Sequence, residues 1–356
     1  MNFSQVSLKY FAALAWCALI ASTVLHAEVA ATAEQKTTFR EALDSAIGRA
    51  EGGMSVAGLD GWYFFDKELK HLACGRYWGD PAAPNAGTSD PLPAILDFKA
   101  QLDKAGVELI VVPVPAKAAV YPDKLSAAFS SPPSTPANLA EQDAAFIEVL
   151  TSNGVRVLDL TGDFLKARAE GLETHCRTDT HWSPEGIRLA AEKTASLISK
   201  FPWAQEQARL PFSLEPVEIQ IHGDLAPAGA PPEALSARRV TQPEVSGSAG
   251  IPDSRNSPIV LLGDSHNLVF HSGGEMHATG AGLPDQLGMA LGFPIDVVAV
   301  MGSGSTAARR SLARRKDNLA GKKLVIWCFS AREFTQGQGW AKVRVVKDQE
   351  PSPISE

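Results

Sequence analysis

The chain has 356 residues, with 33 Lys and Arg against 40 Asp and Glu and a formal net charge of −7. Its longest basic groups are Arg309-Arg310 and Arg314-Arg315-Lys316, which are typical of a solvated helix face, so the sequence gives little support to nucleic-acid binding. An apolar fraction of 45% fits a globular protein with a substantial core, and the length fits one large or two small domains.

Residues 1–27 have the pattern of an export signal. Lys9 is the only charged residue there, the run from Phe11 to Leu25 is apolar or small, and Ala27 offers a small residue for cleavage. Because this run is shorter than the roughly 20 residues that cross a bilayer as a helix, we expect a signal peptide, with an uncleaved N-terminal anchor as the alternative. In either case the remaining chain works outside the cytoplasm.

Three cysteines follow this segment: Cys74, Cys176 and Cys328. Export permits disulfides, so one pair and one free thiol is the simplest expectation. Cys328 lies in an apolar, strand-like run and is expected to be buried. We therefore predict that Cys74 pairs with Cys176, although the sequence leaves other pairings open.

Helices and strands alternate along most of the remaining chain. Apolar residues at helical spacing predict helices over residues 36–51, 93–105 and 138–153, and another that begins at Pro184 and runs through Ile198. A glycine turn at 58–61 leads into an aromatic strand, and apolar runs predict buried strands over residues 109–115, 155–160, 259–262, 297–300 and 324–327. Residues 75–91 and 223–257 are rich in glycine and proline and predict loops, the second of them long or an irregular insertion. The pattern predicts an α/β sandwich with a mainly parallel sheet.

A candidate nucleophile follows one of these strands. The strand over 259–262 runs directly into Gly263-Asp264-Ser265-His266, which places Ser265 at the carboxyl edge of the sheet, where open α/β sheets hold their ligands. Backbone N–H groups just past Ser265 would face a developing oxyanion. The alternative interpretation is a polar turn that caps the next helix, and this motif alone does not decide between the two.

A candidate base lies in Arg177-Thr178-Asp179-Thr180-His181-Trp182. In an extended stretch, residues two apart project to the same side, so Asp179 would orient one imidazole nitrogen of His181 while the other faces a nucleophile. Ser183 and Pro184 are a good N-cap and first residue for the helix that follows, which fixes where this loop ends. The arrangement favours a Ser-His-Asp relay.

Other roles for the histidines are weaker. His175, Cys176, Asp179 and His181 include zinc-ligand types, but their spacing matches no standard zinc motif. His266 is a further candidate base, yet it adjoins Ser265 and is expected to point away from it. The remaining histidines have no carboxylate nearby in the sequence and are interpreted as surface or loop residues: His71, His222, His271 and His277. We predict no metal and no cofactor.

Taken together, four segments resemble the periplasmic alginate O-acetyltransferase family, whose catalytic domain is a variant of the SGNH (GDSL-like) hydrolase fold. Three of them are Gly58-Leu59-Asp60-Gly61-Trp62-Tyr63-Phe64, Arg177-Thr178-Asp179-Thr180-His181-Trp182 and Gly263-Asp264-Ser265. The fourth is Val112-Pro113-Val114-Pro115-Ala116-Lys117 with Tyr121-Pro122-Asp123-Lys124-Leu125. The Asp-x-His pair precedes the serine by about 85 residues, whereas ordinary SGNH hydrolases have the serine first; the permuted order is shared with the alginate acetylation proteins.

The resemblance implies a three-layer SGNH-like domain over residues 36–335, with an irregular insertion at about 223–257 and a C-terminal tail over 336–356. It implies Ser265 as nucleophile, His181 as general base and Asp179 as the residue that orients it. Main-chain N–H groups near Ser265, with Gly302 and Gly304, are oxyanion candidates. The chain ends about 20 residues after Phe334, which leaves no room for a C-terminal carbohydrate-binding module, so polymer binding is expected through Arg309, Arg310 and Arg332 or through a partner.

These features predict O-acetyl transfer to an exported polysaccharide, alginate or a similar exopolysaccharide, through an acetyl-Ser265 intermediate in the periplasm. The family context implies a membrane-bound acyltransferase and other export proteins as partners, and no nucleic acid. Two alternatives remain open. The same triad with water as acceptor would make an SGNH-type carbohydrate acetylesterase, and an inert site would leave a non-catalytic polysaccharide-binding subunit of an export complex.

Overall fold

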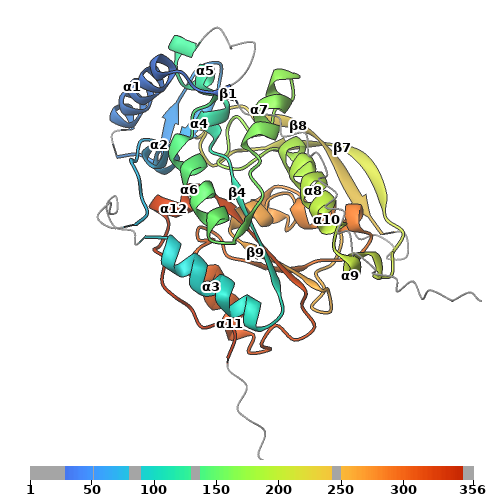
Figure 1. The fold of residues 1–356 in the computed structure, drawn as a ribbon. Coiled ribbons are helices and arrows are strands. Elements are labelled where there is room, and N and C mark those ends of the chain that lie inside the picture. Colours follow the sequence, from blue (N-terminus) through green and yellow to red (C-terminus); the bar gives the residue numbers. More distant parts are fainter. Residues whose placement is uncertain (1–28, 51, 80–89, 130–136, 243–249, 348–356) are drawn as a thin grey trace, which may run out of the picture.

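The centre of the molecule is a parallel β-sheet (Figure 1). The structure is a computed structural model that describes residues 29–50, 52–79, 90–129, 137–242 and 250–347. Five strands lie in the order β10-β9-β11-β4-β6, and every neighbouring pair is parallel. Their bounds are β4 (Glu108–Val114), β6 (Arg156–Val157), β9 (Ile259–Gly263), β10 (Asp296–Ala299) and β11 (Leu324–Ser330). The predicted α/β architecture is confirmed.

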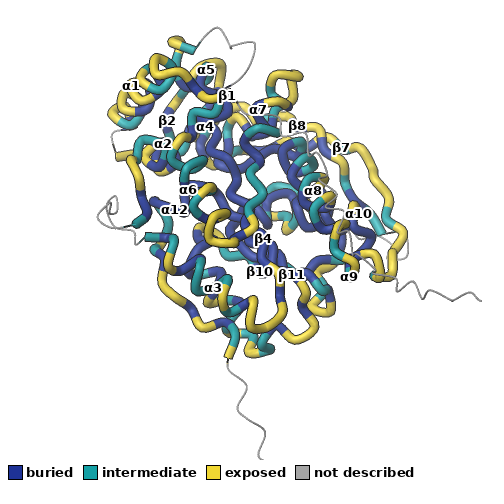
Figure 2. The backbone as a smooth tube through the Cα atoms, viewed as in Figure 1, coloured by how far each residue is buried: buried dark blue, intermediate teal, exposed yellow. Residues whose placement is uncertain are grey.

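Helices cover both faces of this sheet because its central strands are apolar on both sides. Alternate residues of a strand point to opposite faces: Leu261 and Ile326 face one core cluster, and Leu262 and Trp327 face the other. The first cluster includes residues of α7 (Thr161–Ala169), α8 (Pro184–Ile198) and α10 (Leu283–Leu291). The second includes residues of α3 (Leu92–Lys104), α6 (Glu141–Ser152) and α11 (Thr306–Arg314). Figure 2 shows the buried sheet inside this three-layer sandwich.

Smaller elements surround the sandwich. β2 (Ser55–Ala57) and β3 (Tyr63–Phe65) form an antiparallel ribbon. The turn that joins them contains Asp60 and Gly61, both with positive φ, at the glycine turn that the sequence predicts. α1 (Ala33–Arg49) packs on α2 (Asp66–Leu72) and α5 (Pro122–Leu125). The other short elements are β1 (Val29–Ala30), β5 (Ala137–Asn138), α4 (Lys117–Val120), α9 (Pro202–Gln205) and α12 (Glu333–Gln336), with 3₁₀ turns η1 (Ala127–Phe129), η2 (Ser265–Asn267) and η3 (Gly274–Met276).

The prediction that residues 223–257 are irregular is wrong over part of that range. β7 (Ser213–Ile221) and β8 (Glu233–Thr241) form a long antiparallel hairpin, and β8 packs against α8. Leu235 and Ala237 are buried and alternate with the exposed Ala234, Ser236 and Arg238, as the usual period of two requires, and the next buried residue, Val240, lies three positions on. Small and charged side chains hide this alternation in the sequence. Residues 243–249 lie outside the described ranges.

Two chain segments differ from the predicted boundaries. The strand expected at 155–160 is reduced to Arg156–Val157 at the edge of the sheet. Residues 337–347, which the sequence assigns to a tail, pack on the domain, since Trp340, Val343 and Val345 belong to the second core cluster. The expected leader at 1–27 lies outside the described residues. None of the described helices is both long and apolar enough to cross a membrane.

Candidate active site

Ser265 stands at the carboxyl end of β9, on the first residue of the 3₁₀ turn η2. Gly263 ends the strand because a Cβ there would lie 1.6 Å from the carbonyl oxygen of Cys328, so only glycine allows β9 and β11 to approach this closely. The Asp264 carboxylate then accepts from the His266 N–H (3.0 Å) and from the Ser330 N–H (2.9 Å). The capping turn that the sequence left as an alternative is therefore present, and the same turn presents Ser265.

The Asp179–His181 segment is a tight excursion that returns to the start of α8. Its base is closed by bonds from Cys176 N to His181 O and from Ser183 N to Thr174 O. Ser183 caps α8 by accepting from Gly186 N, as predicted. From the other side, Lys117 Nζ donates to the carbonyl oxygens of Asp179 (2.5 Å) and Tyr63 (3.0 Å). The excursion is thus fixed at both ends and at its centre.

The three predicted side chains meet in one hydrogen-bonded relay. Asp179 Oδ1 accepts from His181 Nδ1 at 2.6 Å, and His181 Nε2 lies 2.8 Å from Ser265 Oγ. Ser265 is 7% exposed, His181 5% and Asp179 1%. With Nδ1–H donated to the carboxylate, Nε2 is the nitrogen that accepts the proton of the serine hydroxyl, which is the geometry of general-base activation.

A second imidazole, which the sequence analysis missed, binds the same carboxylate. His277 Nε2 donates to Asp179 Oδ2 at 2.9 Å, and the same oxygen accepts from Asp224 N. His277 has φ +71° and ψ −62°, and Ala278 N donates to Met276 O across it. This is a γ-turn of the rare, strained kind. The strained turn aims the His277 ring at Asp179.

Two buried aspartates of the site, Asp179 and Asp264, are held ionised. Burial alone would raise the pKa of Asp179, but hydrogen bonds from His181 and His277 outweigh it and the pKa lies well below its ordinary value. Burial likewise opposes ionisation of Asp264, yet His266 and Arg332 lower its pKa. Fixed negative charge beside His181 stabilises the imidazolium that forms when it takes a proton.

His266, the alternative base, forms no hydrogen bond to the relay among the described residues; its ring lies beside that of His181. Its Nδ1 is 3.1 Å from Asp264 Oδ1, and its ring centroid is 4.8 Å from that of His181. Burial lowers its pKa to about 4, even though Asp264 opposes the shift. Trp182 Nε1 donates to the His266 carbonyl oxygen. This buried, neutral imidazole is engaged by Asp264 and packs against the rings of His181 and Trp182.

A cavity of about 260 Å³ opens on the relay. Its lining includes Ser265 and His181 of the relay together with Gly302, Arg332 and Glu333. Four apolar side chains and four polar or charged ones complete it: Met54, Phe65, Met276 and Met301, and Lys67, Thr180, Asp224 and Gln336. Glu333, which the sequence did not single out, is buried, and burial raises its pKa to about 7. The cavity therefore combines apolar side chains with charged and polar ones beside the relay, and it has room for an acetyl group.

The candidate oxyanion and substrate residues have different fates. Gly302 lines the cavity with positive φ, and Arg332 lines it while donating to Ser330 Oγ. Gly304 does not fit an oxyanion role, because its N–H already donates to Glu333 Oε2. Arg309 is wrong as a polymer contact: it is 0% exposed and lies over the rings of Trp327 and Trp340. Arg310 is exposed on α11 but does not line this cavity.

Cys74, Cys176 and Cys328 are all free, so the predicted Cys74–Cys176 disulfide is wrong. Cys176 is fully buried in the base of the excursion that carries Asp179 and His181, where its Sγ donates to Trp182 O. Cys74 is half-buried and lines a different depression beside α1. Burial raises the pKa of the Cys176 thiol well above its ordinary value, which keeps it protonated and inert.

Three of the histidines interpreted as lacking a carboxylate partner have one, so that interpretation is wrong for them. His71 pairs with Asp143, His271 with Asp285 and Asp253, and His277 with Asp179. Each of these carboxylates comes from a distant part of the chain, which proximity in the sequence does not reveal. His222 is exposed.

One group of side chains has metal-ligand character within the described ranges. Asp179, His181 and Asp224 bring ligand-type atoms within 4.8 Å of one another. Both nitrogens of His181 are engaged by Asp179 and Ser265, and the Asp224 carboxylate accepts from Thr180 N and Oγ1. This donor set is already saturated by hydrogen bonds and fits the relay better than a metal.

The parallel sandwich with a serine turn after β9 defines an SGNH-like domain. Residues 56–331 match the family described as "SGNH hydrolase-like domain, acetyltransferase AlgX", and the chain belongs to this family. The O-acetyltransferase domain of Pseudomonas putida AlgJ has the same fold, with a TM-score of 0.58 and 24% identity over 79% of this chain and 91% of that one. Pseudomonas aeruginosa AlgX also has a TM-score of 0.58, with 18% identity over 81% of this chain and 65% of that one.

Two curated relatives are named "Probable alginate O-acetylase AlgJ". The protein from Pseudomonas fluorescens is 28% identical over 223 residues, 60% of this chain and 53% of the relative. The protein from Azotobacter vinelandii is 28% identical over 246 residues, 65% of this chain and 59% of the relative. The matched region thus spans little more than half the length of these relatives.

Proposed function

We propose that this protein is an O-acetyltransferase that acetylates hydroxyl groups of an exported polysaccharide through an acetyl-Ser265 intermediate. The observation that carries the proposal is the buried Asp179–His181–Ser265 relay opening on a small cavity. Family membership supports acetyl as the transferred group. The names of the curated relatives point to alginate or a similar exopolysaccharide as the acceptor.

In the first half of the proposed reaction, His181 Nε2 takes the hydroxyl proton as Ser265 Oγ attacks the acetyl carbonyl of the donor. The oxyanion would be held by the N–H groups of Ser265 and Gly302, for which the described residues contain no other acceptor. The bond to the leaving group then breaks, and the leaving group takes the proton from His181. The enzyme is left as an acetyl ester of Ser265.

In the second half, a sugar hydroxyl takes the place of the leaving group. His181 accepts its proton, the hydroxyl oxygen attacks the acetyl carbon, and Ser265 Oγ leaves as it regains a proton from His181. Water in place of the sugar would give hydrolysis. We further propose that the reaction takes place in the periplasm and that a membrane-bound acyltransferase supplies the acetyl group.

The test uses a chromogenic acetyl ester as donor and oligouronates or glucan oligomers as acceptors. We expect acetylated oligomers by mass spectrometry and an acetyl group on the peptide that contains Ser265. Ester release that no oligomer alters, with no acetylated product, would instead establish an acetylesterase.

Substitutions separate an enzyme from an inert subunit. Ser265→Ala and His181→Ala should each lower kcat roughly 10³-fold or more, and Asp179→Asn by a comparable factor, because the three act as a unit. An active-site serine probe should label the wild type and fail to label Ser265→Ala. If the wild-type protein is not labelled and releases no chromogen, the protein is a non-catalytic subunit and the proposal fails.

A further inference from the structure

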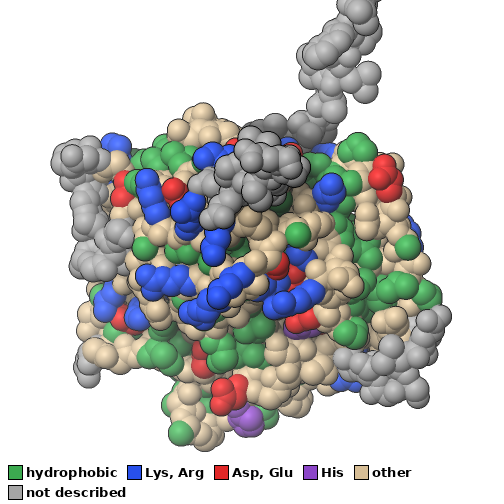
Figure 3. Space-filling view, turned by 90° about the horizontal axis from the view of Figure 1, so that it is seen from below, with side chains coloured by type: hydrophobic (Ala, Val, Ile, Leu, Met, Phe, Trp, Pro, Cys, Tyr) green, Lys and Arg blue, Asp and Glu red, His purple; other side chains and the backbone are tan. Residues whose placement is uncertain are grey.

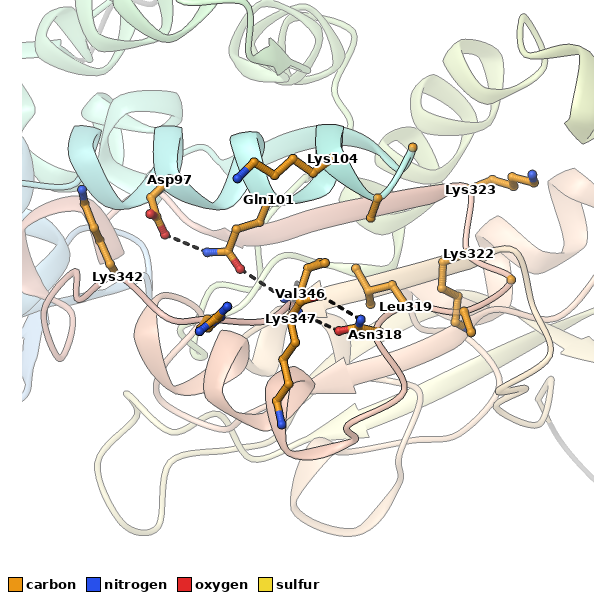
Figure 4. Close-up of a pocket in the computed structure, with 15 residues that line it drawn as sticks. Asp97, Gln101, Lys104, Asn318, Leu319, Lys322, Lys323, Lys342, Val346 and Lys347 are labelled. Atoms are coloured by element: carbon orange, nitrogen blue, oxygen red, sulfur yellow. Dashed lines mark hydrogen bonds between the residues drawn. The ribbon is translucent and has the colours of Figure 1, made fainter. Parts of the chain in front are cut away.

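A second concave surface lies at the opposite edge of the sheet from Ser265. This groove, of about 1140 Å³, is formed by the end of α3, the turn before β11 and the segment over 342–347 (Figure 4). Those elements stand at the amino ends of β4 and β11, whereas the relay stands at the carboxyl ends of the strands. The seven residues of β11 separate the two edges by roughly 20 Å, so the groove is no part of the catalytic cavity.

Side-chain amides fix the two walls of this groove. Gln101 on α3 accepts from the N–H groups of Val345 and Val346. Asn318 accepts from Lys347 N and donates to Lys347 O, in the manner of a strand neighbour. Val343 and Val345 anchor the segment in the core. The groove is therefore a built feature of the fold and not a chance gap between loops.

Basic side chains predominate around it, and the one acidic side chain of its described lining, Asp97, accepts a hydrogen bond from Gln101 Nε2. Lys104, Lys323, Lys342 and Lys347 are exposed, and within the described ranges none of them forms an ion pair. Figure 4 shows Lys104 on α3 beside Gln101, with Lys342 and Lys347 on the facing segment. Lys and Arg side chains gather in a broad band on the face seen from below (Figure 3), the end of the molecule where α3 and α11 lie in Figure 1.

Within the described ranges, these exposed lysines do not neutralise carboxylates of the fold. Lys322, in the same turn, shows the contrast: its Nζ is buried against Asp296 and the carbonyl oxygens of Arg255 and Ser257. The exposed lysines have no such role, and they stand on a chain whose net charge is −7. Like charges kept together around one groove repel one another, so the arrangement favours an anionic ligand.

We propose that this groove binds a linear polysaccharide whose sugars carry carboxylates. The proposal rests on the proposed function and adds to it a second binding site for the polymeric acceptor, away from the relay. A concave, polar lining suits a single flexible chain, whereas a membrane-binding surface would present exposed apolar side chains to the bilayer; Leu319 in this lining is buried. Holding the polymer here raises its local concentration at the catalytic edge without using the small cavity for binding.

Binding of an oligouronate of about a dozen sugars, a length assumed long enough to engage several exposed lysines, is the direct test. Titration calorimetry should show binding to the full protein that weakens as salt is added, because exposed charges are screened. The variant Lys104→Gln/Lys342→Gln should bind about five- to tenfold more weakly. The control Lys166→Gln/Lys200→Gln removes the same charge from exposed lysines elsewhere and should bind like the wild type.

Further measurements separate this proposal from the proposed function. Binding is also measured with Ser265→Ala, which should retain it, and release of a chromogenic ester should be unchanged in both lysine variants. Equal affinity of the groove variant and the control for the oligouronate would overturn the groove proposal. Groove-dependent binding of anionic lipid vesicles or of single-stranded DNA, without binding of oligouronate, would overturn it as well. Ester release that survives Ser265→Ala would instead overturn the proposed function alone.

Discussion

At the scale of single residues, the carboxylate of Asp179 connects two imidazoles. One oxygen orients His181, and the other accepts from His277, which a strained turn presents. A residue held at φ +71° without being glycine costs free energy that the surrounding structure has to offset. The contact with Asp179 gives that strain a role: it keeps the carboxylate ionised and prevents it from rotating away from His181.

Removing this contact should slow catalysis without abolishing it. We expect His277→Ala to lower kcat about tenfold, the value of one orienting hydrogen bond of about 1–2 kcal/mol, with KM for the donor unchanged. His277→Gln, which keeps an N–H donor, should recover part of the rate. The measurement is ester turnover across pH, with thermal unfolding as the control for folding. A kcat equal to that of the wild type in His277→Ala would show that His277 has no positioning role.

The residue scale also shows what the sequence contains and what it hides. Asp179 and His181 are two residues apart, and Ser265 directly follows a buried strand, so local spacing is enough to predict all three. His277 is 98 residues from Asp179, and its approach depends on a backbone conformation that no residue preference predicts. Arg309 was predicted to be exposed because it belongs to a basic cluster. It is buried because aromatic rings from β11 and from the segment beyond α12 enclose its side chain, and these rings are distant from it in the sequence.

At the scale of elements, a buried lysine links three separate parts of the chain around the site. Lys117, at the start of α4, donates to the carbonyl oxygens of Tyr63 in β3 and of Asp179 in the excursion before α8. Its own backbone N–H donates to Glu68 on α2. Burial lowers the pKa of Lys117, and the nearby Glu68 carboxyl opposes that shift.

Replacing this lysine should destabilise the fold strongly. Lys117→Met removes one of the two cations near buried Glu68, the other being Arg332, and leaves two carbonyl oxygens unpaired, which we expect to cost about 3–5 kcal/mol. The double variant Lys117→Met/Glu68→Gln should recover part of that loss, because the buried charge that has lost a cation is gone. Chemical denaturation measures both. A single variant within 1 kcal/mol of the wild type, on the order of one ordinary hydrogen bond, would contradict this account.

The sequence predicts well those elements that have a continuous apolar run or a clear helix cap. β9 and β11 lie at the expected residues because their runs are apolar on both faces, and α8 begins at the expected cap. The β7–β8 hairpin was missed because it is half-exposed, and its inward positions in β8 are mostly small. β6 was expected to be longer because the apolar run over 155–160 continues past the two residues that pair with β4.

At the scale of the whole molecule, the ionisable groups at the two edges of the sheet differ in kind and in burial. The carboxyl edge holds buried groups of both kinds around the relay: the carboxyl groups of Asp179, Asp264 and Glu333, and the basic side chains of His181 and Arg332. The amino edge holds exposed lysines around the groove. Fold class and the three-layer architecture follow from alternating helices and strands, but this difference between the edges does not, since it depends on how residues from α3, β11 and the segment over 342–347 come together.

Buried ionisable groups also set how stability depends on pH. Asp179 and Asp264 have lowered pKa values, so their contribution is present above the ordinary aspartate pKa and is lost as pH falls below it. His271 has a pKa raised to about 10, because Asp253 and Asp285 outweigh the opposing effect of burial. Its contribution is complete below the ordinary histidine pKa of 6.5 and is lost as pH rises toward 10.

Glu333 should make the protein less stable as pH rises from mildly acid to neutral. Burial raises its pKa from 4.5 to about 7, so the folded state retains a proton that the unfolded chain releases. The contribution is therefore complete below pH 4.5 and is lost as pH rises through about 7. We expect the free energy of unfolding of the wild type relative to Glu333→Gln, from urea denaturation at pH 5, 6, 7 and 8, to fall by roughly 2 kcal/mol over this range. The comparison with the variant cancels the opposing contribution of the buried imidazoles of His175 and His266, whose pKa values burial lowers to about 3 and about 4. Glu333→Gln keeps an oxygen for Gly304 and Ser305. The same difference taken with His271→Gln should change only above pH 6.5, and a difference for Glu333→Gln that does not change with pH would contradict this account.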